Sequence, residues 1–232
     1  MDTKEDRPVK LQSILPLITS IIALIFTLGA ARQYSRRRKT HQAVWTLALL
    51  MFAVAAFMEF YSEVAGWNAL MYRWYYVLAA SLVGFLGAGT MFLLSNRPIA
   101  WGYFGFVVIV TLIMLFKALG AALMTEAFIP GITVAGKAMP SDVRLFSPFL
   151  SGTGTLALVG GALFSWAKTK RVYNLFIAVG PLIIAAVGSL ARFGMTNYLY
   201  LGEMLGLAIL YVGFIKSQEV LRPINAKRRV SR

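Results

Sequence analysis

Six stretches of this chain contain no Asp, Glu, Lys or Arg, and each is 19 to 23 residues long. They are residues 11–31, 40–58, 74–96, 98–116, 145–167 and 172–191. A seventh run, 193–215, is interrupted only by Glu203. An α-helix needs about 20 apolar residues to cross the hydrocarbon core of a bilayer, where it satisfies its own backbone polar groups. The sequence therefore predicts an all-α integral membrane protein with seven transmembrane helices.

The flanks of these runs give the expected bounds. We expect a transmembrane domain over 11–215, with helices at about 11–31, 42–64, 74–95, 99–123, 146–167, 173–191 and 197–215. Residues 1–10 would form an N-terminal tail and residues 216–232 a basic C-terminal tail. The segment 125–145 contains two prolines and two glycines, which favour an irregular cap over a long helix.

The first apolar run could instead be a signal peptide that is cleaved after "TLGAA". The segment that follows it, "RQYSRRRKT", contains five Lys or Arg residues. A basic cluster directly after an apolar run acts as a stop-transfer signal. We therefore interpret residues 11–31 as an anchored first helix.

Basic residues are distributed unequally between the two sides of the predicted membrane. The segments after the first, third, fifth and seventh helices carry 15 Lys or Arg residues, and the opposite side carries 7. The positive-inside rule predicts an external N-terminus, a cytoplasmic C-terminus and a multi-pass protein of the plasma membrane. Most of the net charge of +14 lies beside helix ends. This location favours contact with anionic lipid headgroups, and we expect no nucleic-acid partner.

A weak internal similarity raises the question of a repeat. The sequence "LPLITS" at 15–20 and the sequence "SPFLSG" at 147–152 each open a helix that ends in a basic loop. Two parallel three-helix units joined by the fourth helix, a 3+1+3 arrangement, would account for this pattern. The low identity between the two halves leaves the duplication open.

Small residues indicate where helices approach each other. They are Gly84, Gly87, Ala88 and Gly89 in the third helix, Gly152, Gly154, Gly160 and Gly161 in the fifth, and Gly202 and Gly206 in the seventh. Inside lipid, small side chains allow backbones to come close and gain dispersion contacts. We predict close helix packing at these positions.

Cofactor chemistry has few candidates in this composition. The chain has no cysteine and a single histidine, His41. Thiolate sites and histidine-rich zinc sites therefore have no ligands. A retinal-type photoreceptor needs a lysine within the last helix, but the first lysine there is Lys216, at its end. We expect no cofactor and no metal.

Ionisable residues of the apolar runs gather in the predicted outer half of the membrane. Glu59, Lys117 and Glu203 are the deepest. The candidate ligand-binding residues are Glu59, Glu63, Arg73, Lys117, Arg192 and Glu203, with the aromatic residues Tyr61, Trp74, Tyr76 and Tyr200 at the same level. Charged groups in hydrocarbon cost several kcal/mol, on the order of 3 at a helix centre, so they should face the bundle interior.

Two interpretations of this cluster remain open. In one, it is a closed structural network in which Lys117 and Arg192 neutralise Glu59 and Glu203. In the other, it lines a water-accessible site. The aromatic residues could equally form an interfacial belt.

The functional prediction follows from this cluster. We expect a protein that binds, and translocates, a small polar or charged solute through a pocket in the outer half of the bundle. The alternative is a ligand-sensing or accessory subunit that signals through a cytoplasmic partner bound by residues 216–232. An intramembrane enzyme is a third class, but no nucleophile or metal constellation favours it. The sequence specifies neither the ligand nor the oligomeric state.

Overall fold

The computed structural model describes residues 11–128, 134–193, 195 and 198–230, without the side chains of residues 11–13, 192 and 218–230. Within these residues the chain forms helices and no β-strand. Seven of the helices are long and apolar enough to cross a membrane. The predicted fold class is confirmed at this level, and the expected N-terminal tail, residues 1–10, lies outside the description.

The long helices match the charge-free runs. They are α1 (Leu11–Arg37), α2 (Thr40–Ala65), α3 (Ala69–Leu94), α4 (Arg97–Gly120), α6 (Phe146–Thr169), α7 (Tyr173–Arg192) and α8 (Leu199–Val230). Two short elements, η1 (Thr125–Ala127) and α5 (Ser141–Arg144), lie in the expected cap. Two helices extend beyond the apolar runs: α1 continues into the basic cluster, and α8 continues through most of the segment expected to be a tail.

Local signals set several of these boundaries. Asn68 is the N-cap of α3, and its side chain accepts a hydrogen bond from the backbone N–H of Met71 at 2.8 Å. Asn96 caps α4 in the same way, with Pro98 in the first turn. Gly66 ends α2 with a φ of 79°, which glycine adopts at no steric cost. The two asparagine caps satisfy backbone donors that a helix leaves unpaired at its start.

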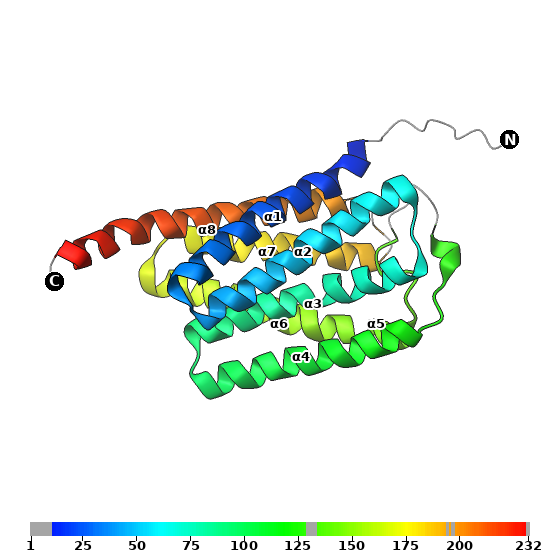
Figure 1. Ribbon diagram of the computed structural model, residues 1–232, viewed down its shortest axis with the longest axis horizontal. Coiled ribbons are helices and arrows are strands. Elements are labelled where there is room, and N and C mark those ends of the chain that lie inside the picture. The colour runs from blue at the N-terminus through cyan, green and yellow to red at the C-terminus, as the bar shows by residue number, and fades with distance from the viewer. Residues whose placement is uncertain (1–10, 129–133, 194, 196–197, 231–232) are drawn as a thin grey trace.

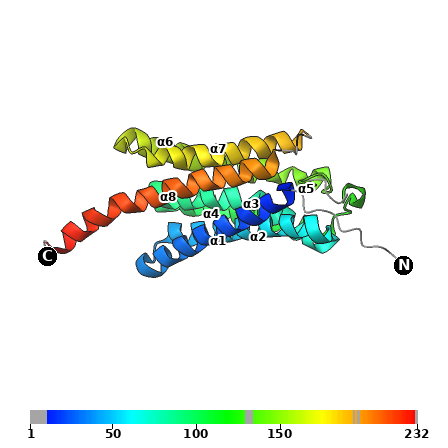
Figure 2. The ribbon, with the colours of Figure 1, turned by 90° about the horizontal axis from the view of Figure 1, so that it is seen from above.

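Six helices form a closed ring, and α4 lies outside it. Around the ring, α1 contacts α2, α2 contacts α3, α3 contacts α6, α6 contacts α7, α7 contacts α8, and α8 returns to α1. The seventh helix, α4, packs mainly on α3. Figure 1 shows the helices side by side along one axis, and Figure 2 shows α6 and α7 on the far side of α8 from α1 and α2.

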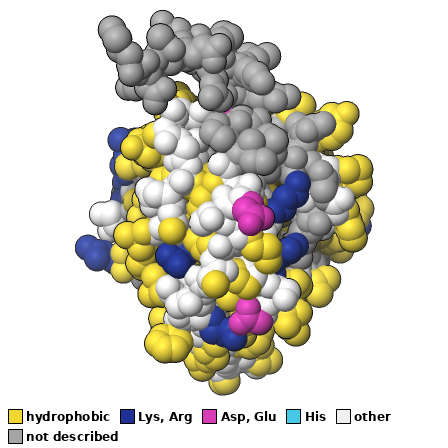
Figure 3. Space-filling view, turned by 90° about the vertical axis from the view of Figure 1, so that its right-hand side faces the viewer, with side chains coloured by type: hydrophobic (Ala, Val, Ile, Leu, Met, Phe, Trp, Pro, Cys, Tyr) yellow, Lys and Arg dark blue, Asp and Glu magenta, His cyan; other side chains and the backbone are white. Residues whose placement is uncertain are grey.

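The two ends of the bundle differ. We use "α5 end" for the end that holds η1, α5 and the links from α2 to α3 and from α7 to α8. We use "basic end" for the end with the turns at 38–39, 95–96 and 170–172. Figure 3 looks onto the α5 end, where basic and acidic side chains are scattered among hydrophobic ones.

Glycine contacts hold α3 against α6 and α7 against α8. A Cβ added at Gly87 would lie 2.8 Å from the Cα of Gly154, and one at Gly206 would lie 2.6 Å from the carbonyl oxygen of Gly180. Real Cβ atoms do not come this close, so larger residues would force the helices apart. The predicted close packing at Gly87, Gly154 and Gly206 is confirmed. The prediction is wrong for Gly152 and Gly160, where an added Cβ would meet no atom within 4 Å.

An aromatic cluster closes the core at the α5 end. Tyr72 is fully buried and its ring contacts Trp67, Tyr75, Tyr76 and Phe128. The Tyr72 hydroxyl donates a hydrogen bond to the carbonyl oxygen of Ala135 at 2.8 Å. The segment after Val134 is thereby attached to the helices.

Candidate functional site

Two carboxyl groups, on α2 and α8, meet near the α5 end. Glu59 is 3% exposed, and its Oε1 accepts a hydrogen bond from the Tyr75 hydroxyl of α3 at 2.6 Å. The side chains of Glu59 and Glu203 also lie close enough for their carboxyl groups to interact. Glu59 of α2 thus interacts with side chains of both α3 and α8. In the ring, α2 is a neighbour of α3 but not of α8.

Two carboxyl groups that lie side by side have a chemical requirement. An ionised carboxylate is only an acceptor, so one of the two groups must carry a proton for a hydrogen bond to form between them. Two neighbouring negative charges would instead repel each other, and burial of Glu59 strengthens that repulsion. The pair can therefore hold one shared proton, and losing it would push α2 and α8 apart.

A second acid lies one turn along α2. Glu63 is half-buried and accepts a hydrogen bond from the Tyr200 hydroxyl of α8 at 3.1 Å. Residues four apart lie on one helix face, so Glu59 and Glu63 both face α8. In the described part of the chain, no Lys or Arg side chain forms an ion pair with Glu59, Glu63 or Glu203.

Glu203 also lines a cavity of about 770 Å³. The cavity lies between α3, α6, α7 and α8, with Ala135, Gly136 and Lys137 at its α5 end. Its lining on α3 runs from Tyr75 to Leu86, about 16 Å at 1.5 Å per residue. A volume of this size is in the range that holds small-molecule ligands, about 300–1,000 Å³.

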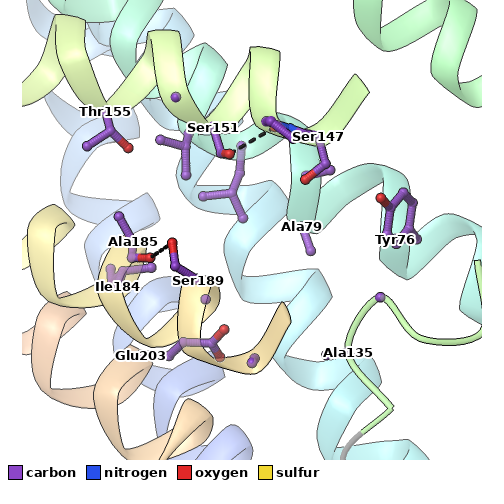
Figure 4. A pocket seen from close by; sticks show the side chains of 18 of the residues that line it. Tyr76, Ala79, Ala135, Ser147, Ser151, Thr155, Ile184, Ala185, Ser189 and Glu203 are labelled. Carbon is purple, nitrogen blue, oxygen red and sulfur yellow. Dashed lines mark hydrogen bonds between the residues drawn. The ribbon is translucent and has the colours of Figure 1, made fainter. Parts of the chain in front are cut away.

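Hydroxyl groups line one wall of this cavity. Ser147, Ser151 and Thr155 are four residues apart along α6 and share one face, and Ser189 of α7 lies opposite them (Figure 4). The hydroxyls of Ser151 and Ser189 each donate to the carbonyl oxygen four residues earlier, at 2.8 Å. The oxygen of Ser189 retains acceptor capacity, since a hydroxyl has two lone pairs.

The charged lining is concentrated near the α5 end. Lys137 is exposed, and Arg144 of α5 is half-buried. A Cβ built on Gly136 would lie 3.8 Å from Arg144 Nε, so the Arg144 side chain lies beside this loop at the α5 end of the cavity. The opposite end is apolar and includes Phe52, Leu86 and Leu210.

The predicted basic residues do not neutralise the acids as one interpretation required. Lys117 Nζ lies 2.7 Å from Asp142 Oδ2, in a pair exposed to solvent, so the expected contact between Lys117 and Glu59 or Glu203 is wrong. Arg73 donates from Nε to the carbonyl oxygen of Ala118 at 3.0 Å, and from a second nitrogen to that of Ala121 at 2.9 Å. It caps the C-terminal end of α4. The side chain of Arg192 lies outside the described residues.

The predicted aromatic residues divide into two groups. Tyr76 and Tyr200 are 7% exposed; Tyr76 lines the cavity and Tyr200 binds Glu63. Tyr61 and Trp74 are 46% and 41% exposed, and neither lines the cavity. These two positions suit the interfacial belt that the sequence left open.

Several residues at the site were not among the candidates. Tyr75, which binds Glu59, and Arg144, which lines the cavity, are two of them. A usable signal for Tyr75 was its spacing, because Tyr72, Tyr75 and Tyr76 share one helix face and Trp74 does not. The hydroxyl stripe of α6 has a similar period of four.

A metal site has no candidate ligand group in the described part of the chain. No group of three or more His, Cys, Asp or Glu side chains there is arranged to hold a metal ion. Comparison with known proteins identifies no relative: no family model, no curated protein and no solved structure matches this chain. The described residues place a cavity beside a pair of neighbouring carboxyl groups.

Proposed function

We propose that this protein is a multi-pass carrier of the plasma membrane that binds a small polar or charged solute in the cavity and moves it across the bilayer with proton exchange. The observation that carries the proposal is the position of Glu203. Glu203 lines the cavity, and its carboxyl group lies beside that of buried Glu59. A ligand in the cavity would therefore compete with, or displace, the shared proton.

The topology that we propose has an external α5 end and a cytoplasmic basic end, as the positive-inside rule requires. The ring of helices supports a 3+1+3 arrangement. Helices α1 to α3 make one consecutive contact set and α6 to α8 another, and α4, which links them in sequence, lies outside the ring. Rocking of one three-helix unit against the other would open the cavity to alternate sides.

The carboxyl pair links the two three-helix units, because Glu59 belongs to the unit α1 to α3 and Glu203 to the unit α6 to α8. With a shared proton the pair holds the units together. Loss of the proton replaces a hydrogen bond with repulsion. Pro181, which lines the cavity on α7, lies where a helix can bend, because proline leaves a carbonyl oxygen without its usual donor.

Proteoliposomes loaded with a pH-sensitive dye test this proposal. A panel of anionic, cationic and neutral solutes is added outside, and we expect one class to drive proton movement in the wild type. Glu203→Gln should abolish this coupling, because a glutamine cannot exchange a proton. Glu63→Gln is the matched control, since Glu63 lies outside the carboxyl pair, and it should retain the coupling. Proton movement that is identical in wild type and Glu203→Gln would refute the proposal.

A second candidate function is supported by α8. This helix carries Glu203 and continues without a break past the last apolar residues to Val230. A change at the carboxyl pair could therefore reach the basic segment 216–232, where a cytoplasmic partner would bind. In that case the protein is a sensor. Truncation after Ser217 would then preserve ligand binding and abolish association with the partner, and solute flux would be absent from the wild type.

A further inference from the structure

The cavity is polarised along its length. Its α5 end contains two cationic side chains, Lys137 and Arg144. Its other end is lined by Phe52, Leu82, Leu86, Leu158, Ile184 and Leu210, without a charged or hydroxyl group among them. A fully hydrophilic solute would leave this apolar end in contact with water, which is unfavourable by about 25 cal/mol per Å². The ligand that matches both ends is charged at one end and apolar at the other.

Arg144 determines the sign of that charge. Its side chain is half-buried at the α5 end of the cavity, and among the described residues it has neither a hydrogen-bond acceptor nor an ion-pair partner. The neighbouring Asp142 is already bound by Lys117. A guanidinium presents a planar set of donors that suits carboxylate and phosphate oxygens. The single acid of the cavity lining, Glu203, is occupied by Glu59.

The route into the cavity is indicated by lining residues at and beside α6 and α7 that are also exposed. Leu156 of α6 is 75% exposed, Leu145, directly before α6, is 65% exposed, and Ser189 of α7 is exposed as well. Gly152 of α6 and Gly188 of α7 also line the cavity, and a Cβ added at either would meet no atom within 4 Å. By contrast, a Cβ at Gly154 would collide with the α3 backbone. The cavity therefore opens sideways between α6 and α7, toward the hydrocarbon of the membrane.

We infer that the ligand is an anionic amphiphile, a carboxylate or phosphate head on an apolar chain, which enters between α6 and α7. The head lies between Arg144 and Lys137, and the chain extends toward Leu86 and Leu158. This inference rests on the proposed function only in taking the cavity as the ligand site. It does not require translocation.

Displacement of a fluorescent fatty acid from the full chain in zwitterionic nanodiscs tests the head group. The competitors are dodecanoate, dodecanol and dodecyltrimethylammonium, with empty nanodiscs subtracted. We expect dodecanoate to compete at least about tenfold better than the other two. Arg144→Gln should remove this preference, and Lys168→Gln, at the basic end, should keep it. Equal competition by all three compounds, or an unchanged preference in Arg144→Gln, would overturn the inference.

The lateral opening is tested by filling it. Gly188→Leu places a side chain in the gap between α6 and α7 and should slow association of the fluorescent fatty acid about tenfold or more. Gly160→Leu is the matched control, because Gly160 is exposed on α6, does not line the cavity and also has open space around its Cβ position. Equal association rates in the two variants would exclude this entrance.

Two further arms separate the possible outcomes. Adding phosphatidylglycerol to the nanodiscs shows the source of the ligand: if it competes, the amphiphile is a bilayer lipid, and if it does not, a free single-chain acid. Dodecanoate binding and proton movement are both measured on the wild-type protein. Binding without proton movement would refute the proposed carrier and leave the amphiphile site standing. Proton-coupled flux of a hydrophilic solute without dodecanoate binding would refute the amphiphile site and leave the proposed carrier standing.

Discussion

The hydrogen bond between Tyr75 and Glu59 allows a quantitative prediction. Replacing Glu59 by leucine removes the acceptor of the Tyr75 hydroxyl, on a residue that is 6% exposed, and replacing Tyr75 by phenylalanine removes the donor. Each single change leaves the other partner of this bond unsatisfied, which the double variant Glu59→Leu/Tyr75→Phe does not. The loss of Glu59 beside Glu203 is common to Glu59→Leu and the double variant, so it cancels in the coupling. The losses in free energy of unfolding of the two single variants should therefore add up to more than the loss in the double variant.

The structure sets the expected size of this coupling. Interhelical hydrogen bonds in membranes contribute about 0.6 kcal/mol on average and up to about 1.7. The 2.6 Å separation and the deep burial of both groups place this pair at the upper end, so we expect a coupling of about 1–2 kcal/mol. Unfolding in mixed micelles with increasing dodecyl sulfate, followed by circular dichroism, gives the four free energies.

A second cycle serves as its control. Glu63 and Tyr200 are joined at 3.1 Å and Glu63 is only half-buried, so Glu63→Leu/Tyr200→Phe should show a coupling of about 0.5 kcal/mol. Strictly additive effects in the Glu59 cycle, or equal coupling in both cycles, would show that burial and distance do not set the strength of these bonds. The reasoning about the site would then fail.

Three other predictions test the packing and the topology. Arg73→Met should destabilise the protein by about 1–3 kcal/mol, because it leaves carbonyl oxygens at the end of α4 without donors, and Arg73→Lys should restore part of the loss; thermal unfolding measures both. Gly154→Val should prevent folding or lower the melting temperature strongly, whereas Gly160→Val should be tolerated. Because the chain has no cysteine, single cysteines at Lys137 and Lys170 report topology: a membrane-impermeant maleimide added to intact cells should label the first and spare the second.

The seven long helices were predictable because the solvent imposes them. Charge is expensive in hydrocarbon and unpaired backbone groups are excluded from it, so the runs without charge correspond closely to the helices. The same rule does not say how far a helix continues once it has left the membrane. For this reason the sequence did not predict that α8 continues to Val230. The glycine contacts could also be anticipated, since close approach requires small residues.

The site was only partly predictable. Glu59 and Glu203 were identified because a carboxyl group within an apolar run needs a partner. Which partner each charge finds depends on the arrangement of helices, and this is a property of the tertiary structure. Arg73 and Lys117 looked like members of the same cluster, yet one caps α4 and the other binds Asp142 at the surface. A stretch of sequence does not show which neighbouring helix end a long side chain will reach.

The length of α8 has a mechanical consequence. Measured from Glu203 to Val230, the helix is about 40 Å long at 1.5 Å per residue. A tilt of about 10° at the carboxyl pair would swing the far end by about 7 Å, more than one helical turn. The red end of this helix extends beyond all of the others in Figure 1. Because α8 acts as a lever, a small tilt caused by gain or loss of one proton at the carboxyl pair would produce a large movement of its far end. That movement would be enough to make or break a contact at the membrane surface.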